Sequence, residues 1–191
     1  MDAVAADLLA VRDGDGMEAR ALTALVEAVL PRAWRRDSAW HGEAHWRCVA
    51  ATGHELGAEH DRVDPSLVFC FGLLHDTRRE NEAYDPEHGH RAAAFADELR
   101  AEGALALDER RFAALVEALR LHADGRVSED PTIGTCWDAD RLHLPRVSID
   151  PDPRLLSTPA ALGAGPLAAA AALREHGAPD WDALVAAVAG T

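Results

Sequence analysis

The segment LVFCFGLLHDTRREN, residues 67–81, begins with the most apolar run in the chain. Charged and ionisable residues follow that run directly. Seven of its first eight residues are apolar, which predicts a helix buried on nearly every side. His75 and Asp76 follow at once, and three more charged residues come directly after Thr77, namely Arg78, Arg79 and Glu80. Burying ionisable groups is costly unless they are paired or bound to a metal. The rest of the sequence must therefore supply a partner for His75 and Asp76.

Length and charge narrow the range of functions. The chain has 191 residues, of which 48% are hydrophobic, and this predicts one domain over 1–191 with a sizeable core. The formal net charge is −14, which argues against duplex nucleic acid as a partner, because phosphate backbones attract clustered lysine and arginine. A small anionic substrate remains compatible, since a metal and arginines in one pocket can outweigh the overall field.

Cysteine use and apolar run lengths predict a cytoplasmic protein. The three cysteines, Cys48, Cys70 and Cys136, form no CxxC pair, which fits a reducing compartment. The N-terminal MDAVAADLLAVRDGDG lacks the basic start and the long apolar run of a signal peptide. No run approaches the ~18 apolar residues of a membrane span, so no membrane association is expected.

Apolar residues recur at helical spacing and almost never alternate, so the chain is expected to be an all-α, irregular helical bundle. Asp64, Asp108 and Asp130 are candidate N-caps, and proline follows two of them. Loops are expected at 13–16 and 150–154. Helices are expected near residues 18–31, 43–57, 65–76, 89–103, 108–122, 131–142, 159–176 and 180–189.

Three of these helices carry an ionisable group on an apolar face. The stripes are Ile133, Trp137, Asp140 and Leu144; Phe112, Leu115, Leu119 and His122; and His45, Val49, Thr52 and Leu56. Trp137 is expected to be a core residue. A single histidine on such a face is usually a core residue bonded to a carbonyl. With His75 and Asp76, however, four helices direct such groups inward.

One metal centre would satisfy all of these buried groups together, whereas independent groups would each need their own partner. The donors are imidazole nitrogens and carboxylate oxygens without thiolate, which suits Fe, Mn, Co, Ni or Zn. We therefore expect His75 and Asp76 to be metal ligands at the end of a rigid, buried helix.

The order of these residues resembles the HD-domain superfamily of metal-dependent phosphohydrolases. The resemblance runs from about residue 40 to 145, through WHGEAHW, LLHDTRREN, DPEHGHRAA and PTIGTCWDADRL, segments similar to an uncharacterised bacterial HD subfamily. It implies that the primary metal is held by His45, His75, Asp76 and Asp140. Asp140 is preferred to Asp138 because it precedes the basic residue of DADR and lies on the inward stripe.

The resemblance also covers two-metal members of the superfamily. It implies a second metal held by His88 and His122, with Asp76 bridging the two ions. His90 competes with His88, because both lie within one turn. One departure is His143, where the resemblance predicts aspartate.

The resemblance further suggests residues that act on substrate. Arg79 and Arg78 are expected to bind phosphate. Asp76 and Glu80 are candidates for catalysis, the second as a general acid or base. His41 and Arg141 are candidate substrate contacts, although Arg141 could pair with a carboxylate and His41, like Trp46, could line the pocket or pack.

Three functions follow from this reading, and the first is the leading one. It is hydrolysis of a nucleotide or another small phosphate ester by a water that one or two divalent metals activate. The second is a di-iron HD-fold oxygenase that activates dioxygen for oxidative bond cleavage. The third is a non-catalytic sensor of a nucleotide or metal. The tail at 159–191 is expected to pack as two helices on the core, and homo-oligomer formation stays open.

Overall fold

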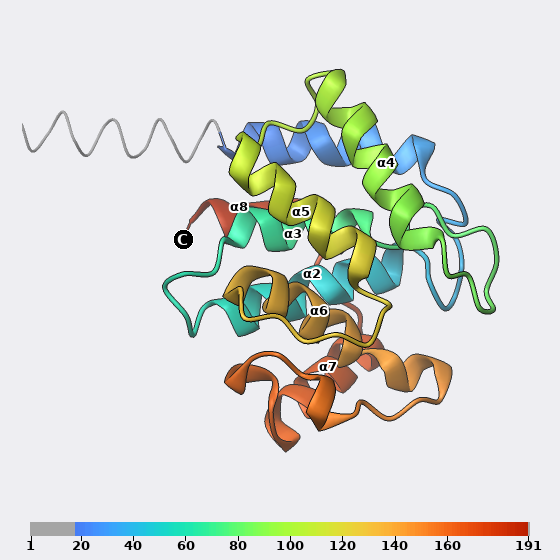
Figure 1. The fold of residues 1–191 in the computed structure, drawn as a ribbon, viewed down its shortest axis with the longest axis vertical. Coiled ribbons are helices and arrows are strands. Elements are labelled where there is room, and N and C mark those ends of the chain that lie inside the picture. The colour runs from blue at the N-terminus through green and yellow to red at the C-terminus, as the bar shows by residue number, and fades with distance from the viewer. Residues whose placement is uncertain (1–17, 191) are drawn as a thin grey trace, which may run out of the picture.

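The computed structural model describes residues 18–190, and every regular element in that range is a helix, which confirms the all-α prediction (Figure 1). Residues 18–29 are helical and run into the 3₁₀ helix η1. The named elements are η1 (Leu30–Arg32), α2 (Glu43–Gly57), α3 (Pro65–Leu74), α4 (His88–Ala101), α5 (Glu109–Leu121), α6 (Pro131–Arg141), η2 (Leu144–Val147), η3 (Pro153–Leu155), η4 (Pro159–Ala161), α7 (Ala164–His176) and α8 (Trp181–Ala189).

Helix α3 is the central element of the fold. Every residue from Ser66 to Leu74 is buried, as its unbroken apolar run predicts. It packs along α2 and also contacts α5, α6 and α8, and Figure 1 shows it in the middle of the bundle. The helix ends at Leu74, and His75 is its C-cap. The ionisable residues therefore begin where α3 leaves the apolar core.

Gly72 lets α2 and α3 approach closely, and its replacement tests how much that approach matters. A Cβ at Gly72 would lie 2.7 Å from Cα of Ala50 and 2.8 Å from its backbone nitrogen, so a helix backbone would have to move. Gly72→Ala should lower the free energy of unfolding by about 1–3 kcal/mol, as measured by urea denaturation. Gly165→Ala in α7 is the control, because its Cβ meets no atom within 4 Å and alanine favours helix. Equal stability of the two variants would show that the α2–α3 contact is not tight.

Helix starts follow the sequence closely. The side chain of Asp64 accepts a hydrogen bond from the backbone of Leu67, and Asp108 and Asp130 cap α5 and α6 in the same way. Each cap satisfies backbone N–H groups that the first turn leaves unpaired. All three predicted N-caps are confirmed.

The predicted continuous helix at 159–176 is wrong. Residues Pro159–Ala161 form only the 3₁₀ turn η4, and α7 begins at Ala164. Gly163 lies between them with φ +99°, a left-handed backbone that a regular helix does not contain. Helix α7 packs against α2, and α8 packs against α2 and α3. Among residues 18–190, no helix is long and apolar enough to cross a membrane.

Candidate metal centre

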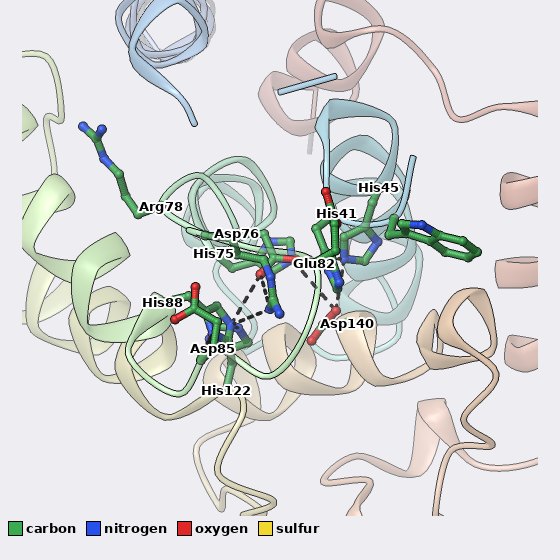
Figure 2. Close-up of polar contacts among 12 residues, drawn as sticks. His41, His45, His75, Asp76, Arg78, Glu82, Asp85, His88, His122 and Asp140 are labelled. Carbon is green, nitrogen blue, oxygen red and sulfur yellow. Dashed lines mark hydrogen bonds and ion pairs between the residues drawn. The ribbon is translucent and has the colours of Figure 1, made fainter. Parts of the chain in front are cut away.

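The ends of α3, α5 and α6 and the starts of α2 and α4 bring the predicted ligands into one cluster (Figure 2). His45 lies in the first turn of α2, and His75 and Asp76 follow α3. His88 begins α4 and His122 caps the end of α5. Asp140 lies in the last turn of α6. The residues of the three inward stripes are buried, apart from Asp140 and Leu144, which are partly buried; Leu144 lies beyond the end of α6 in η2.

The first set of donors, here called the primary group, consists of His45, His75, Asp76 and Asp140. The Nε2 atoms of His45 and His75 lie 3.2 Å apart, and Asp76 Oδ2 lies 3.7 and 3.6 Å from them. Asp140 Oδ1 lies 3.2 Å from His45 Nε2 and 3.9 Å from His75 Nε2. Ligands bound at about 2.1 Å to one octahedral ion are separated by roughly 3.0 Å when adjacent and 4.2 Å when opposite, and these five distances lie within that range.

The second group consists of Asp76, His88 and His122. His88 Nε2 lies 3.4 Å from Asp76 Oδ1 and 2.7 Å from His122 Nε2. Asp76 therefore directs Oδ2 at the primary group and Oδ1 at the second group. The residues His45, His75 and Asp76 could hold a metal ion, and so could Asp76, His88 and His122.

Hydrogen bonds to the backbone fix the direction of three imidazoles. Nδ1 of His75, His88 and His122 each lies within hydrogen-bonding distance of the carbonyl oxygen three residues earlier. A carbonyl only accepts, so Nδ1 carries the proton and Nε2 directs its lone pair into the cluster. The facing lone pairs of His88 and His122 repel unless both bind a cation. The donor set therefore fits a metal.

Burial and local charge keep these groups in the protonation states that metals bind. Burial lowers the pKa of His75 and His122, and burial with Arg146 holds that of His45 well below its usual range. Burial and His122 lower the pKa of His88 to about 4. The pKa values of the two carboxyls are lowered as well, which keeps Asp76 and Asp140 ionised. Burial opposes their ionisation, but neighbouring histidines, and Arg146 beside Asp140, hold both pKa values well below the usual range.

These shifts predict that the metal-free protein loses stability in mild acid. The unfolded chain binds protons at histidine below about pH 6.5, while folded His88 stays neutral down to about pH 4. Stability is therefore full above pH 6.5 and falls toward pH 4, by up to about 1.4 kcal/mol per pH unit for each such histidine. Urea denaturation of chelator-treated protein at pH 7.5 and 5.0 measures this fall. His88→Gln should make it shallower, and equal stability at both pH values would contradict the prediction.

A cavity of about 570 Å³ opens onto both groups. Asp76, Asp140, His88 and His122 line it, and so do His41 and three arginines, Arg79, Arg141 and Arg146. Its volume lies within the roughly 300–1,000 Å³ that is typical of small-molecule sites. Metal ions held by these donors would therefore be accessible to a ligand, unlike the ion of a closed structural site.

The predicted substrate arginines differ in where their side chains lie. Arg79 lines the cavity, with Nη1 3.4 Å from both Asp76 Oδ1 and His88 Nε2. Arg141 lines it too, but it donates to the backbone carbonyl of Leu155. Arg78 does not line the cavity, and Figure 2 shows it pointing away from the cluster. Its guanidinium lies 3.6 Å from the ring centroid of Phe95, so the observed contacts of Arg78 are structural.

Four other residues that the sequence analysis named are not part of the two donor groups, although the ring of His143 lies edge-on to that of His45, with centroids 5.9 Å apart. Glu80 is 61% exposed and does not line the cavity, and His90 is exposed. His143 is buried, with Nε2 2.9 Å from Thr52 Oγ1. Asp138 accepts hydrogen bonds from the backbones of Ser157 and Thr158, which tie down the C-terminal segment.

Asp140 behaves differently from Asp138. Its Oδ1 is buried and makes no hydrogen bond of good geometry within the described part of the chain. A buried carboxylate oxygen without a hydrogen bond is costly, and a bound metal would offset that cost. Of the two aspartates, Asp140 has the environment of a ligand.

Sequence reasoning missed Arg146, which lies against the primary group. Its Nε donates to the carbonyl of Trp40 at 2.8 Å and its Nη1 to that of His143 at 3.1 Å. These bonds direct the guanidinium toward Asp140 Oδ1 at 3.6 Å and Asp76 Oδ2 at 3.8 Å. Arg146 lies in η2, beyond the end of α6, so the helical spacing that identified Asp140 could not locate it.

No family model, curated protein or solved structure matches this chain. The functional assignment therefore depends on the chemistry of the cluster itself. Buried histidine and aspartate side chains could hold a metal, and a cavity with arginines adjoins them.

Proposed function

We propose that this protein is a metal-dependent phosphohydrolase of the HD type, acting on a nucleotide or another small phosphate ester. The observation that supports it most is the cavity, which adjoins both donor groups and is lined by arginines. A buried cluster of donors alone would fit a structural ion equally well. Access to the donors, with cations beside them, is what a site for an anionic substrate requires.

In this proposal His45, His75, Asp76 and Asp140 hold one divalent ion, and His88 and His122 share Asp76 to hold a second. Such ions, of Fe, Mn, Co, Ni or Zn, supply Lewis acidity and lower the pKa of water. Arg79 and Arg146 bind the phosphate oxygens, for which a guanidinium fork is suited. His41, whose Nδ1 lies 3.1 Å from Asp76 Oδ2, orients that carboxylate.

The same donors support a second candidate, an oxygenase with two irons. Four imidazoles and two carboxylates are a nitrogen-rich set, which suits iron as well as zinc. The arginines would then bind an anionic substrate in the same cavity. A sensor without catalysis is less favoured, because the cavity adjoins the donors directly.

Metal content and activity should be measured together. Protein purified without chelator is assayed for metals, then reloaded with Fe, Mn, Co, Ni or Zn. Each form is tested for phosphate release from a panel of nucleotides and simple phosphate esters. Release that requires metal is the expected result, and no release from any ester would overturn the proposal. Dioxygen uptake by the iron form without ester hydrolysis would favour the oxygenase, and ligand binding without either reaction would favour the sensor.

A further inference from the structure

Two large apolar side chains stand exposed at the mouth of the cavity. Tyr84 is 87% exposed and Ile149 is 53% exposed, and both line the cavity. They come from different segments, since Tyr84 follows α3 and Ile149 follows η2. Single exposed apolar residues are common, but two that line one ligand cavity form a surface that a ligand can cover.

Two hydrogen bonds hold the residues just before Tyr84. Glu82 Oε1 accepts from Arg35 Nη2 at 2.7 Å, which ties the segment to the chain before α2. Ala83 presents its carbonyl to Arg79 Nη2 at 2.9 Å. Ala83 is therefore hydrogen-bonded to Arg79, whose guanidinium also lies close to Asp76 and His88. The backbone just before Tyr84 is therefore fixed, while Tyr84 itself is exposed.

The segment that carries Ile149 is also fixed. Ser148 adopts the left-handed conformation, with φ +62°, and its backbone N–H bonds to the carbonyl of Pro145 at 3.1 Å. The backbone N–H of Ile149 reaches the carbonyl of Leu144 at 3.3 Å. A non-glycine residue rarely adopts positive φ, so this turn is held by its surroundings. It brings Val147 and Ile149 to the cavity wall next to Arg146.

The cavity therefore has two chemically different parts. Its inner part has the metal donors with Arg79 and Arg146, and its outer part has apolar side chains from both segments and from η3. These are Ala83, Tyr84, Pro86, Val147, Ile149 and Leu155. The carboxylates of Glu82, Asp124 and Asp152 also line the cavity, and each is paired with an arginine. Inorganic phosphate or a short polar ester would leave the outer part empty. A ligand that fills both parts has an anionic head and an apolar body.

We infer that the outer wall is a binding subsite for the apolar organic group of a phosphate ester, with Tyr84 and Ile149 as its main contacts. The inference rests on the proposed function, which supplies the anionic head. It narrows the substrate class to phosphate esters whose organic part is apolar. The affinity for such an ester should then rise with the apolar area of its organic group, because binding removes that group and the outer wall of the cavity from water.

Calorimetric binding of methylphosphonate and hexylphosphonate to the Mn²⁺-loaded protein tests this without turnover. The two probes share the head and differ only in apolar length. We expect hexylphosphonate to bind at least about tenfold more tightly than methylphosphonate. Full burial of its five additional methylenes would give a larger gain in affinity than this. In a Tyr84→Ser, Ile149→Ser double variant that ratio should fall to about two, with methylphosphonate affinity unchanged. Leu162→Ser is the matched control, since Leu162 is 49% exposed and lies outside the cavity.

The outcomes separate this inference from the proposed function. Equal affinity for the two probes in the unaltered protein would overturn the subsite and leave the phosphohydrolase proposal standing. A chain-length effect that survives the double variant would also overturn it. Failure of both probes to bind would contradict the anion site itself, and the subsite would fall with it.

Discussion

Asp76→Asn should abolish metal binding at both donor groups. Asp76 is the one residue that the two groups share, with Oδ2 3.6 Å from His75 Nε2 and Oδ1 3.4 Å from His88 Nε2. The change keeps the shape of the side chain but replaces a charged ligand oxygen with an amide group, which cannot bridge two ions. Metal content should fall to near zero, and metal-dependent phosphate release should fall on the order of 10³-fold. Elemental analysis and phosphate assays measure the two effects.

Two other variants show whether the loss reflects the site or the fold. His122→Asn should remove at most the ion of the second group, because the primary group is intact. His90→Asn should change nothing, since His90 is exposed on the same first turn of α4 as His88. Added metal should raise the thermal stability of the unaltered protein, because it binds the folded state. It should not raise that of Asp76→Asn. Full metal content in this variant would show that the donors do not form the proposed site.

The sequence predicts most of the fold because helix signals are local. Asp64, Asp108 and Asp130 each satisfy the first turn of their own helix, so the information needed to predict them lies within a few residues. The run from Leu67 to Leu74 is apolar on every side, and only a central helix can bury it. The exception is the break at Gly163, because an alanine-rich sequence favours helix on both sides of it.

Periodicity also predicts which ionisable groups share a face with an apolar stripe, as long as the helix continues. In α6, Asp138 and Asp140 are two residues apart and therefore on different faces. The stripe of Ile133 and Trp137 selects Asp140, and the structure gives Asp138 the separate task of bonding Ser157 and Thr158.

Beyond the helix ends this information is lost. Arg78 and Arg79 are adjacent after α3, and nothing local shows that Arg79 turns toward Asp76 while Arg78 packs on Phe95. Arg146 depends on the path of the chain through η2 and on carbonyls of Trp40 and His143. These contacts are formed by tertiary packing, so sequence spacing does not encode them.

Arg146→Gln should have opposite effects on metal and on phosphate. The guanidinium lies 3.6 Å from Asp140 Oδ1 and contributes to the lowered pKa values of His45 and Asp140, so it creates a positive potential at the primary group. Removing that charge should raise metal affinity, by about tenfold. It should also remove a fork that binds phosphate oxygens, so kcat/KM should fall by about 10²–10³-fold, the range seen when one donor to a reacting oxyanion is lost.

The opposite signs distinguish a substrate contact from a purely structural arginine. If Arg146 only held the site together, its loss should weaken metal binding and phosphate binding alike. Arg146→Lys should retain the positive potential but lose the paired N–H groups, so metal affinity should stay near the original while kcat/KM remains low. Arg78→Gln is the matched control, because its guanidinium packs on Phe95 outside the cavity and its loss should alter neither quantity. Metal titration and initial rates on these three variants test the prediction, and weaker metal binding in Arg146→Gln would contradict it.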